Sequence, residues 1–220
     1  MDQFIREVDE EYRREQIAAL WRRYGALIVA LAVLVVAGVA GWRFYETRRE
    51  QQAQAASARY EEALQLARDG KASEAESALS GLTGEGPDGY RLVARFRLAA
   101  ETGRREASDG AKAFEAIAGD AAVPGTLQDL ARLRAAVLRL DMAEAADEAV
   151  RGLERLAAPS NPWRHTAREM LGLSLLKRGD VEGAGKWFDQ IAADRETPAG
   201  LRSRLEIYVA LVAGGRVQTQ

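Results

Sequence analysis

His165 is the single histidine of the chain, and histidine is the side chain that most often acts as a general base or a metal ligand near neutral pH. It follows Asn161 and Pro162, a pair that suits the N-cap and first position of a helix. The chain contains no cysteine, so no second histidine or cysteine exists to complete a zinc site. We therefore interpret His165 as a surface or packing residue rather than a catalyst.

Other catalytic patterns are also missing from the sequence. The glycine-rich run Gly84–Gly89 lacks the Lys-Ser/Thr pair of a phosphate-binding loop, and no strand precedes it. No Gly-x-Ser-x-Gly nucleophile elbow occurs. Adjacent acids such as Glu61 and Glu62 fit a helix face, and Trp163 and Trp187 fit helix packing better than a ligand site. We predict that the protein is not an enzyme and binds no cofactor, metal or small-molecule substrate.

The charge balance bears on the class of partner. The chain carries 31 basic and 33 acidic side chains, for a net charge of −2, so no basic field exists to hold nucleic acid. Alanine, arginine, glutamate and leucine dominate, a mixture that favours helix over strand. We therefore expect an all-α fold with protein partners, and the sequence leaves the oligomeric state open.

One apolar stretch, Gly25 to Gly41, organises the chain. It contains no charged and no polar side chain, and aromatic and arginine residues flank it on both sides. Aromatic rings at both ends suit the two membrane–water interfaces, so we predict a single transmembrane helix over residues 25–45. Two other interpretations stay open. The stretch could be a buried helix of a soluble protein, or a cleaved signal peptide with its cleavage site near Gly38-Val39-Ala40.

The segment before this helix, residues 1–24, reads as an amphipathic head. Phe4, Val8 and Tyr12 recur every four residues, with charges on the other faces. Such a helix could lie near the membrane or against a partner protein, or it could be a solvated leader. Arginines lie on both sides of the apolar stretch in similar number, so the positive-inside rule favours a short head inside and a large tail outside only slightly.

A helical hairpin recurs along the tail, residues 46–220. The segment Arg168 to Pro198 contains Gly172, a turn at Gly179, then Ala184 and Phe188, and it resembles the tetratricopeptide pattern. Gly172 is small where two helices would cross, and Gly179 can take the left-handed conformation that ends a helix. Each hairpin cannot bury its apolar face alone, so we expect stacking.

The same frame fits three earlier segments, which predicts four hairpins. The predicted turns lie at Gly70, Gly103, Asp141 and Gly179. The last apolar helix, about Pro198 to Val212, has no partner hairpin and reads as a terminal cap. Its predicted buried face consists of Leu201, Leu205, Val209 and Val212. The alternative is an irregular helical bundle without a repeat.

A stack of helical hairpins is curved, and the first helix of each hairpin lines the concave face. Positions of the sequence that fall on this face are partly cationic and partly aliphatic, which suits an extended or helical polypeptide segment. The predicted partner-binding residues are Arg68, Arg97, Arg139, Lys177 and Leu173. Alternatively, these basic residues are ordinary solvated charges.

The layout as a whole resembles a known family. A short charged head, one span that ends in Gly41-Trp-Arg-Phe-Tyr45, a Gln/Ala-rich run into Tyr60-Glu-Glu-Ala63, and degenerate tetratricopeptide helices are similar to the YfgM-like ancillary subunits of the SecYEG translocon of Gram-negative bacteria. The resemblance implies an inner-membrane protein with its head in the cytoplasm and its tail in the periplasm. It also implies association with translocon subunits and periplasmic chaperones, so that exported proteins pass from the channel to folding factors.

A second function class stays open beside this one. The protein could instead be a cell-envelope or division-associated tetratricopeptide scaffold that self-associates through its head or its span. The proteins that co-purify with it would separate the two classes.

Overall fold

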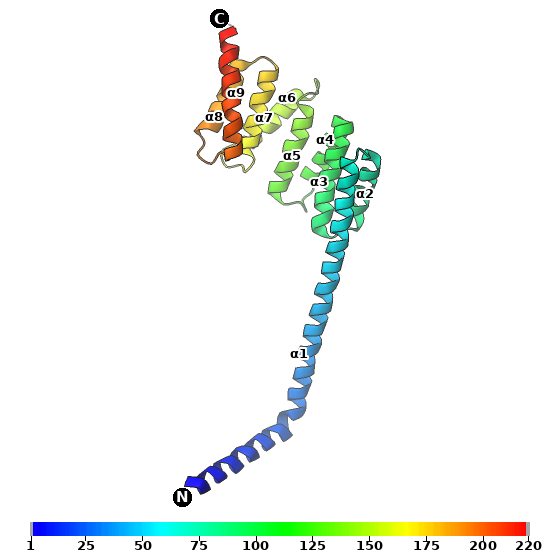
Figure 1. Ribbon diagram of the computed structural model, residues 1–220, viewed down its shortest axis with the longest axis vertical. Coiled ribbons are helices and arrows are strands. Elements are labelled where there is room, and N and C mark those ends of the chain that lie inside the picture. Colours follow the sequence, from blue (N-terminus) through cyan, green and yellow to red (C-terminus); the bar gives the residue numbers. More distant parts are fainter. Residues whose placement is uncertain (1, 219–220) are drawn as a thin grey trace. The chain divides into compact units, whose positions relative to one another are not determined.

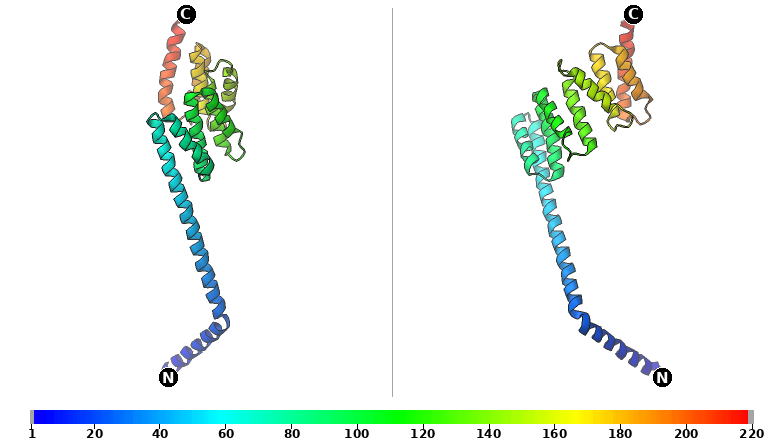
Figure 2. Two further views of the ribbon diagram at one scale, coloured as in Figure 1. Left: turned by 90° about the vertical axis from the view of Figure 1, so that its right-hand side faces the viewer. Right: turned by 180° about the vertical axis from the view of Figure 1, so that it is seen from behind.

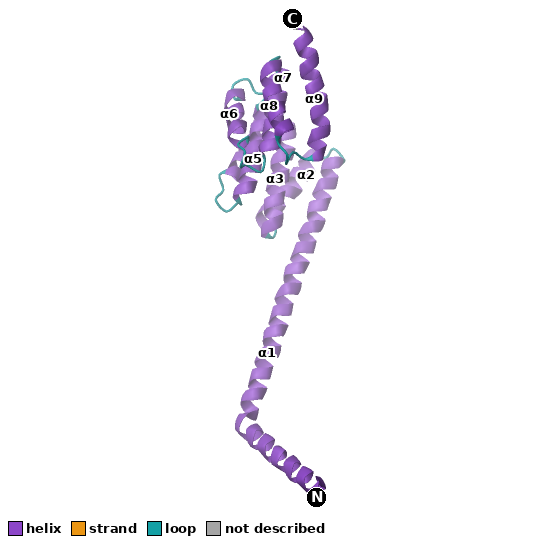
Figure 3. Cartoon of the chain, turned by 90° about the vertical axis from the view of Figure 1, so that its left-hand side faces the viewer, coloured by secondary structure: helices purple, strands orange, loops and turns teal. Residues whose placement is uncertain are grey.

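The computed structural model describes the backbone of residues 2–218 and the side chains of residues 21–214. Within this part of the chain all regular structure is helical, and loops and turns join the helices (Figure 3). The all-α prediction is thus confirmed. In chain order, the helices labelled in Figure 1 are α1 (Asp2–Arg68), α2 (Ala72–Glu85), α3 (Asp88–Arg105), α4 (Ala107–Ala118), α5 (Gly125–Arg139), α6 (Ala146–Leu156), α7 (Arg164–Lys177), α8 (Val181–Ala193) and α9 (Ala199–Gln218).

The chain divides into two compact units, Met1–Ala55 and Ala56–Gln220. The first unit consists of the greater part of α1. From Leu27 to Val39 its apolar side chains are exposed, with Leu34 at 70% and Val36 at 67% of their maximum accessible area. The helix is long and apolar enough to cross a membrane, with a mean hydropathy of 2.4 over its most apolar 18 residues. The pattern predicted for the head depends on Phe4, Val8 and Tyr12, whose side chains lie outside the described range.

The second unit is a series of helical hairpins, as the repeat predicted. The last turns of α1 pair with α2, and the pairs α3–α4, α5–α6 and α7–α8 follow (Figures 1 and 2). Each helix from α2 onwards also packs against the next one in the chain, so the hairpins stack in sequence order. Helix α9 packs against α8 and ends the series.

Two of the predicted turns depend on glycine in the left-handed region. Gly70 has a φ of 77° and Gly179 a φ of 82°, a conformation that glycine adopts at little cost. At the second turn the Asp180 N–H donates to the Leu175 carbonyl at 2.9 Å, which satisfies a carbonyl that the end of α7 leaves free. The Asp180 side chain then accepts from the Gly183 N–H at 2.8 Å and caps α8.

The turn predicted at Gly103 is wrong. Helix α3 continues to Arg105, and the chain breaks at Glu106, which has an extended backbone. Gly103 instead lies where α3 touches α4, because a Cβ on Gly110 would come within 2.3 Å of the Gly103 Cα. The sequence pattern identified a glycine that matters, but here its lack of a side chain matters and its backbone freedom does not.

Four apolar clusters form the core of the second unit, one after another along the stack. Gly172 lies at a close helix crossing, as predicted, since a Cβ on Gly172 would lie 2.4 Å from the Phe188 ring. Phe188 and Ala184 are fully buried. This crossing of α7 and α8 confirms the hairpin interpretation at the level of side chains.

Helix α9 confirms most of its predicted buried face. Leu201, Leu205 and Val212 are buried, but Val209 is 46% exposed, so its assignment to the core is wrong. Tyr208 packs on the core in place of Val209, and its ring stacks on Phe188 with centroids 5.1 Å apart. The spacing of a helix explains the error, because residues 201, 205, 208 and 212 lie on one stripe while residue 209 is about 100° further round.

Candidate interaction groove

An open hollow of about 640 Å³ lies on the first helices of the first three hairpins. We call it the α3–α5 groove. Its walls come from α3 and α5, with a side chain from α1 and one from α4. The lining residues are Tyr60, Leu92, Val93, Phe96, Arg97, Ala100, Gly103, Arg104, Phe114, Leu127, Leu130, Arg134, Val137 and Leu138.

Helix periodicity explains why these residues meet. On α3 the lining positions recur at intervals of three and four, which places them on one face of the helix. Phe96 packs against Phe114 of α4, with ring centroids 6.0 Å apart and an angle of 56° between the planes. Leu92, Phe96 and Ala100 also pack on the core beneath. The floor of the groove is therefore continuous with the core, and its shape depends on core packing.

The groove is apolar with a cationic edge. Its lining includes Arg97, Arg104 and Arg134 and no acidic side chain. Glu101 lies one turn from Arg97 on α3, is buried, and forms ion pairs with both Arg97 and Arg104. Arg134 of α5 is exposed and makes no hydrogen bond or ion pair with any other described side chain.

Tyr60 closes the end of the groove nearest the first hairpin. Its ring meets the edge of Tyr90 with centroids 6.4 Å apart. Burial raises the pKa of the Tyr60 hydroxyl above its ordinary value, and the Arg97 guanidinium acts in the opposite direction. The hydroxyl therefore stays protonated near neutral pH and can donate a hydrogen bond to a bound segment.

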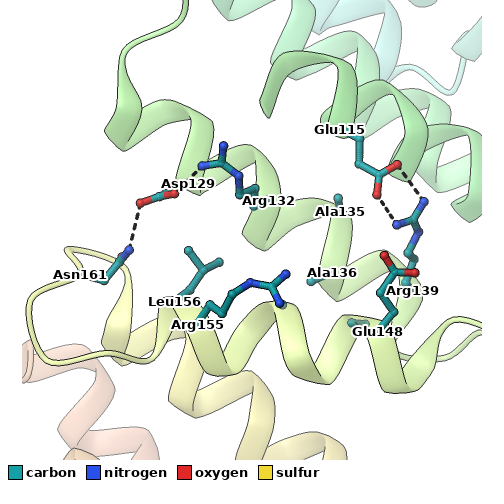
Figure 4. A pocket seen from close by; sticks show the side chains of 12 residues that line it. Glu115, Asp129, Arg132, Ala135, Ala136, Arg139, Glu148, Arg155, Leu156 and Asn161 are labelled. Carbon is teal, nitrogen blue, oxygen red and sulfur yellow. Dashed lines mark hydrogen bonds and ion pairs between the residues drawn. The ribbon is translucent and has the colours of Figure 1, made fainter. Parts of the chain in front are cut away.

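A second, more polar pocket of about 330 Å³ lies among α4, α5 and α6 (Figure 4). At one end Arg139 forms a two-bond ion pair with Glu115 of α4. The side chains of Arg155 and Glu148 of α6 make no hydrogen bond or ion pair with other described residues, and Glu148 lies beside Arg139. Because its lining arginines and acids balance, this pocket has no net preference for the charge of a ligand.

The structure distributes the predicted partner-binding residues over different places. Arg97 lines the α3–α5 groove, while Arg139 lines the polar pocket. Lys177 pairs with Asp141 across 2.6 Å, and Arg68 hydrogen-bonds Gln65 one turn earlier on its own helix. Leu173 is partly buried against the cluster that contains Phe188. Only Arg97 of the five therefore belongs to the groove, and their roles in binding stay predictions.

The groove contains residues that the sequence reasoning missed. Val93 is 47% exposed, and it lines the groove with Leu127, Leu130 and Val137 of α5. The signal was present, because α3 and α5 carry apolar residues on more than one stripe. A second apolar stripe is the sign of a helix that contacts something besides its own core.

His165 lies in a polar cluster at the start of α7. It is buried, its Nδ1 lies 3.4 Å from the Thr197 hydroxyl, and its Nε2 lies 3.7 Å from the Asp194 carboxylate. Arg164 donates to the same carboxylate at 2.9 Å and holds the pKa of Asp194 down at about 2. Over the described residues, no group of three or more His, Cys, Asp or Glu side chains is placed to hold a metal ion.

Comparison with known proteins agrees with this architecture. The chain is 25% identical over 193 residues to a protein named ancillary SecYEG translocon subunit from Escherichia coli (strain K12), and the match covers 86% of this chain and 91% of that protein. No solved structure matches the chain. A family model described as a tetratricopeptide repeat-like domain matches residues 19–208. The chain belongs to the tetratricopeptide repeat-like domain family.

Proposed function

We propose that the protein is a non-catalytic interaction module of the bacterial inner membrane, ancillary to the Sec translocon. In this proposal residues 1–24 form a cytoplasmic head, residues 25–45 cross the membrane once, and residues 46–220 form a periplasmic tetratricopeptide-like domain that ends in a capping helix. The tail binds exported polypeptides and periplasmic chaperones and so links the channel to folding factors. The predicted residues Arg68, Arg97, Arg139, Lys177 and Leu173 contribute partner contacts.

One observation carries this proposal. The similarity to the translocon subunit covers 86% of this chain and 91% of that protein, so it is not confined to a single hairpin. The family model likewise matches residues 19–208, a range that includes the apolar helix. A match confined to the hairpins would support only a general protein-binding role, because this architecture serves many partners. The exposed apolar helix before the hairpins supports a membrane anchor, because such side chains are unfavourable in water.

The topology can be tested with single cysteines, because the chain contains none of its own. Ser160 is exposed in the turn after α6, and Gln3 lies in the head. We expect a membrane-impermeant maleimide to label Ser160→Cys in intact spheroplasts and Gln3→Cys only after lysis. The reverse pattern would place the tail in the cytoplasm and exclude the periplasmic role.

The partners can be tested by affinity purification of the full chain from membranes solubilised in mild detergent, followed by mass spectrometry. We expect translocon subunits and periplasmic chaperones to co-purify. A chain whose Arg68, Arg139 and Lys177 are changed to Glu tests whether these residues contribute to the contact. Recovery of envelope or division proteins in place of translocon subunits would refute the translocon role and favour the scaffold alternative.

A further inference from the structure

The α3–α5 groove leaves apolar side chains open to solvent. Val93 is 47% exposed, and the half-buried Leu127, Leu130 and Val137 of α5 line the same hollow. Partly exposed apolar side chains that share one hollow form a site that an apolar ligand can cover, because covering them removes apolar area from water. The size and open shape of the groove suit several side chains of a polypeptide rather than a small polar molecule.

The side chains that line the groove carry only positive charge, unlike the chain as a whole. The whole chain is slightly acidic, with 31 basic against 33 acidic residues, yet the groove lining holds three arginines and no acid. The buried Glu101 offsets only part of this charge. Arg97 is still not fully satisfied, because its Nε is buried without a hydrogen-bond acceptor.

Arg134 is the cation most open to a ligand. It lines the groove from α5, opposite the arginines of α3, and it has no partner among the described side chains. Arg132 and Arg139 of the same helix are held by Asp129 and Glu115. An unpaired guanidinium beside an apolar surface is suited to a carboxylate, which it can bind through two parallel hydrogen bonds.

From this arrangement we propose that the α3–α5 groove binds a polypeptide segment with apolar or aromatic side chains flanked by acidic residues. The inference rests on the proposed function, because it specifies which kind of polypeptide segment the interaction module binds. Apolar side chains enter between α3 and α5, and a flanking carboxylate meets Arg134. A segment flanked by lysine would place like charges together and bind more weakly.

The test uses the full chain in nanodiscs of zwitterionic lipid and three fluorescein-labelled nonapeptides. The first has a Leu-Phe-Val core between glutamates, the second has the same core between lysines, and the third has a serine core between glutamates. Fluorescence anisotropy at physiological salt gives each Kd. We expect the first peptide to bind about tenfold more tightly than the second, the ratio that one charge-assisted hydrogen bond supports. The serine-core peptide should bind more weakly than either.

Two charge reversals separate the groove from general electrostatics. Arg134→Glu should abolish the preference for the glutamate-flanked over the lysine-flanked peptide. Arg151→Glu is the matched control, because Arg151 is exposed on α6, has no partner among the described residues and lies outside the groove. It should leave the preference unchanged. Val93→Asp should weaken the apolar-core peptides and confirm that they occupy the groove.

Two results would overturn the inference. One is equal affinity of the glutamate-flanked and lysine-flanked peptides for the wild-type chain, and the other is the same change in preference from Arg134→Glu and Arg151→Glu. Neither result bears on the co-purification of translocon subunits, so the proposed function can stand when the groove chemistry fails. Conversely, a selective groove without translocon subunits in the purified sample would refute the proposed function alone.

Discussion

The crossing of α7 and α8 at Gly172 is one of the closest helix contacts of the tail. We predict that Gly172→Ala lowers the stability of the protein, although alanine favours a helix over glycine. The added Cβ would lie 2.4 Å from one atom of the Phe188 ring and 2.7 Å from another. Phe188 is fully buried and stacked on Tyr208, so its ring has no free space to enter.

The expected magnitude is the difference of two effects. Overpacking of a core costs about 1–3 kcal/mol, and the value here should fall at the upper end because the ring is enclosed. Replacing glycine by alanine inside a helix contributes about 1 kcal/mol in favour of the variant. The free energy of unfolding should therefore fall by about 2 kcal/mol. For a domain of this size, that corresponds to a Tm lower by about 4–8 °C.

The assay is thermal unfolding of the full chain in detergent, followed by circular dichroism at the helix minimum. Gly81→Ala is the matched control, because Gly81 lies inside α2 with no atom within 4 Å of the added Cβ. It should raise the Tm by about 2–4 °C. A smaller side chain in place of Phe188 should relieve the clash. Gly172→Ala should therefore lower the Tm by less in a Phe188→Leu background. A Gly172→Ala Tm at or above that of the wild type would refute the reasoning.

Three further variants test the same unit by the same thermal unfolding. Burial, followed by the Arg164 charge, lowers the pKa of His165 in the folded protein. The unfolded chain therefore binds a proton at higher pH, and the stability of the fold should decrease as the pH drops below the ordinary histidine value of 6.5. His165→Gln should make stability less dependent on pH in this range, and an unchanged dependence would contradict the lowered pKa of His165. Tyr208→Phe loses a 2.9 Å hydrogen bond to the buried Glu169 and should cost about 1 kcal/mol, whereas a neutral result would mean that Glu169 is satisfied without it. Gly179→Ala, at a φ of 82°, should cost about 1 kcal/mol, and a stabilised variant would show that this turn needs no glycine.

Local patterns predicted the hairpins well, because each one depends on residues close together in the chain. Gly70 and Gly179 end helices, and Gly172 and Phe188 meet across a single turn. Helix boundaries of this kind follow from backbone conformation and short-range spacing. The same local reasoning failed at Gly103, where two uses of glycine, backbone freedom and the absence of a side chain, look alike in a sequence.

The groove could not be predicted in the same way, because it depends on the rotation of α3 and α5 about their axes. Arg97 and Arg139 were both assigned to one concave surface, yet one lines the groove and the other lines the polar pocket. A shift of one residue in a repeat frame turns a side chain by about 100°, which is enough to move it to another face. Degenerate repeats make such shifts difficult to detect.

The arginines show why charge counts do not locate a binding site. Most of the cations near the candidate surfaces are committed to partners within the chain. Arg139 pairs with Glu115, Arg132 pairs with Asp129, and Arg97 and Arg104 share Glu101. A cation held in this way contributes to the fold and offers little net charge to a ligand. The relevant quantity is what remains after internal pairs are removed, and around the α3–α5 groove that remainder is Arg134. Because Arg134 lies in the same groove as the exposed Val93, substitution of Arg134 is the most direct test of binding to the α3–α5 groove.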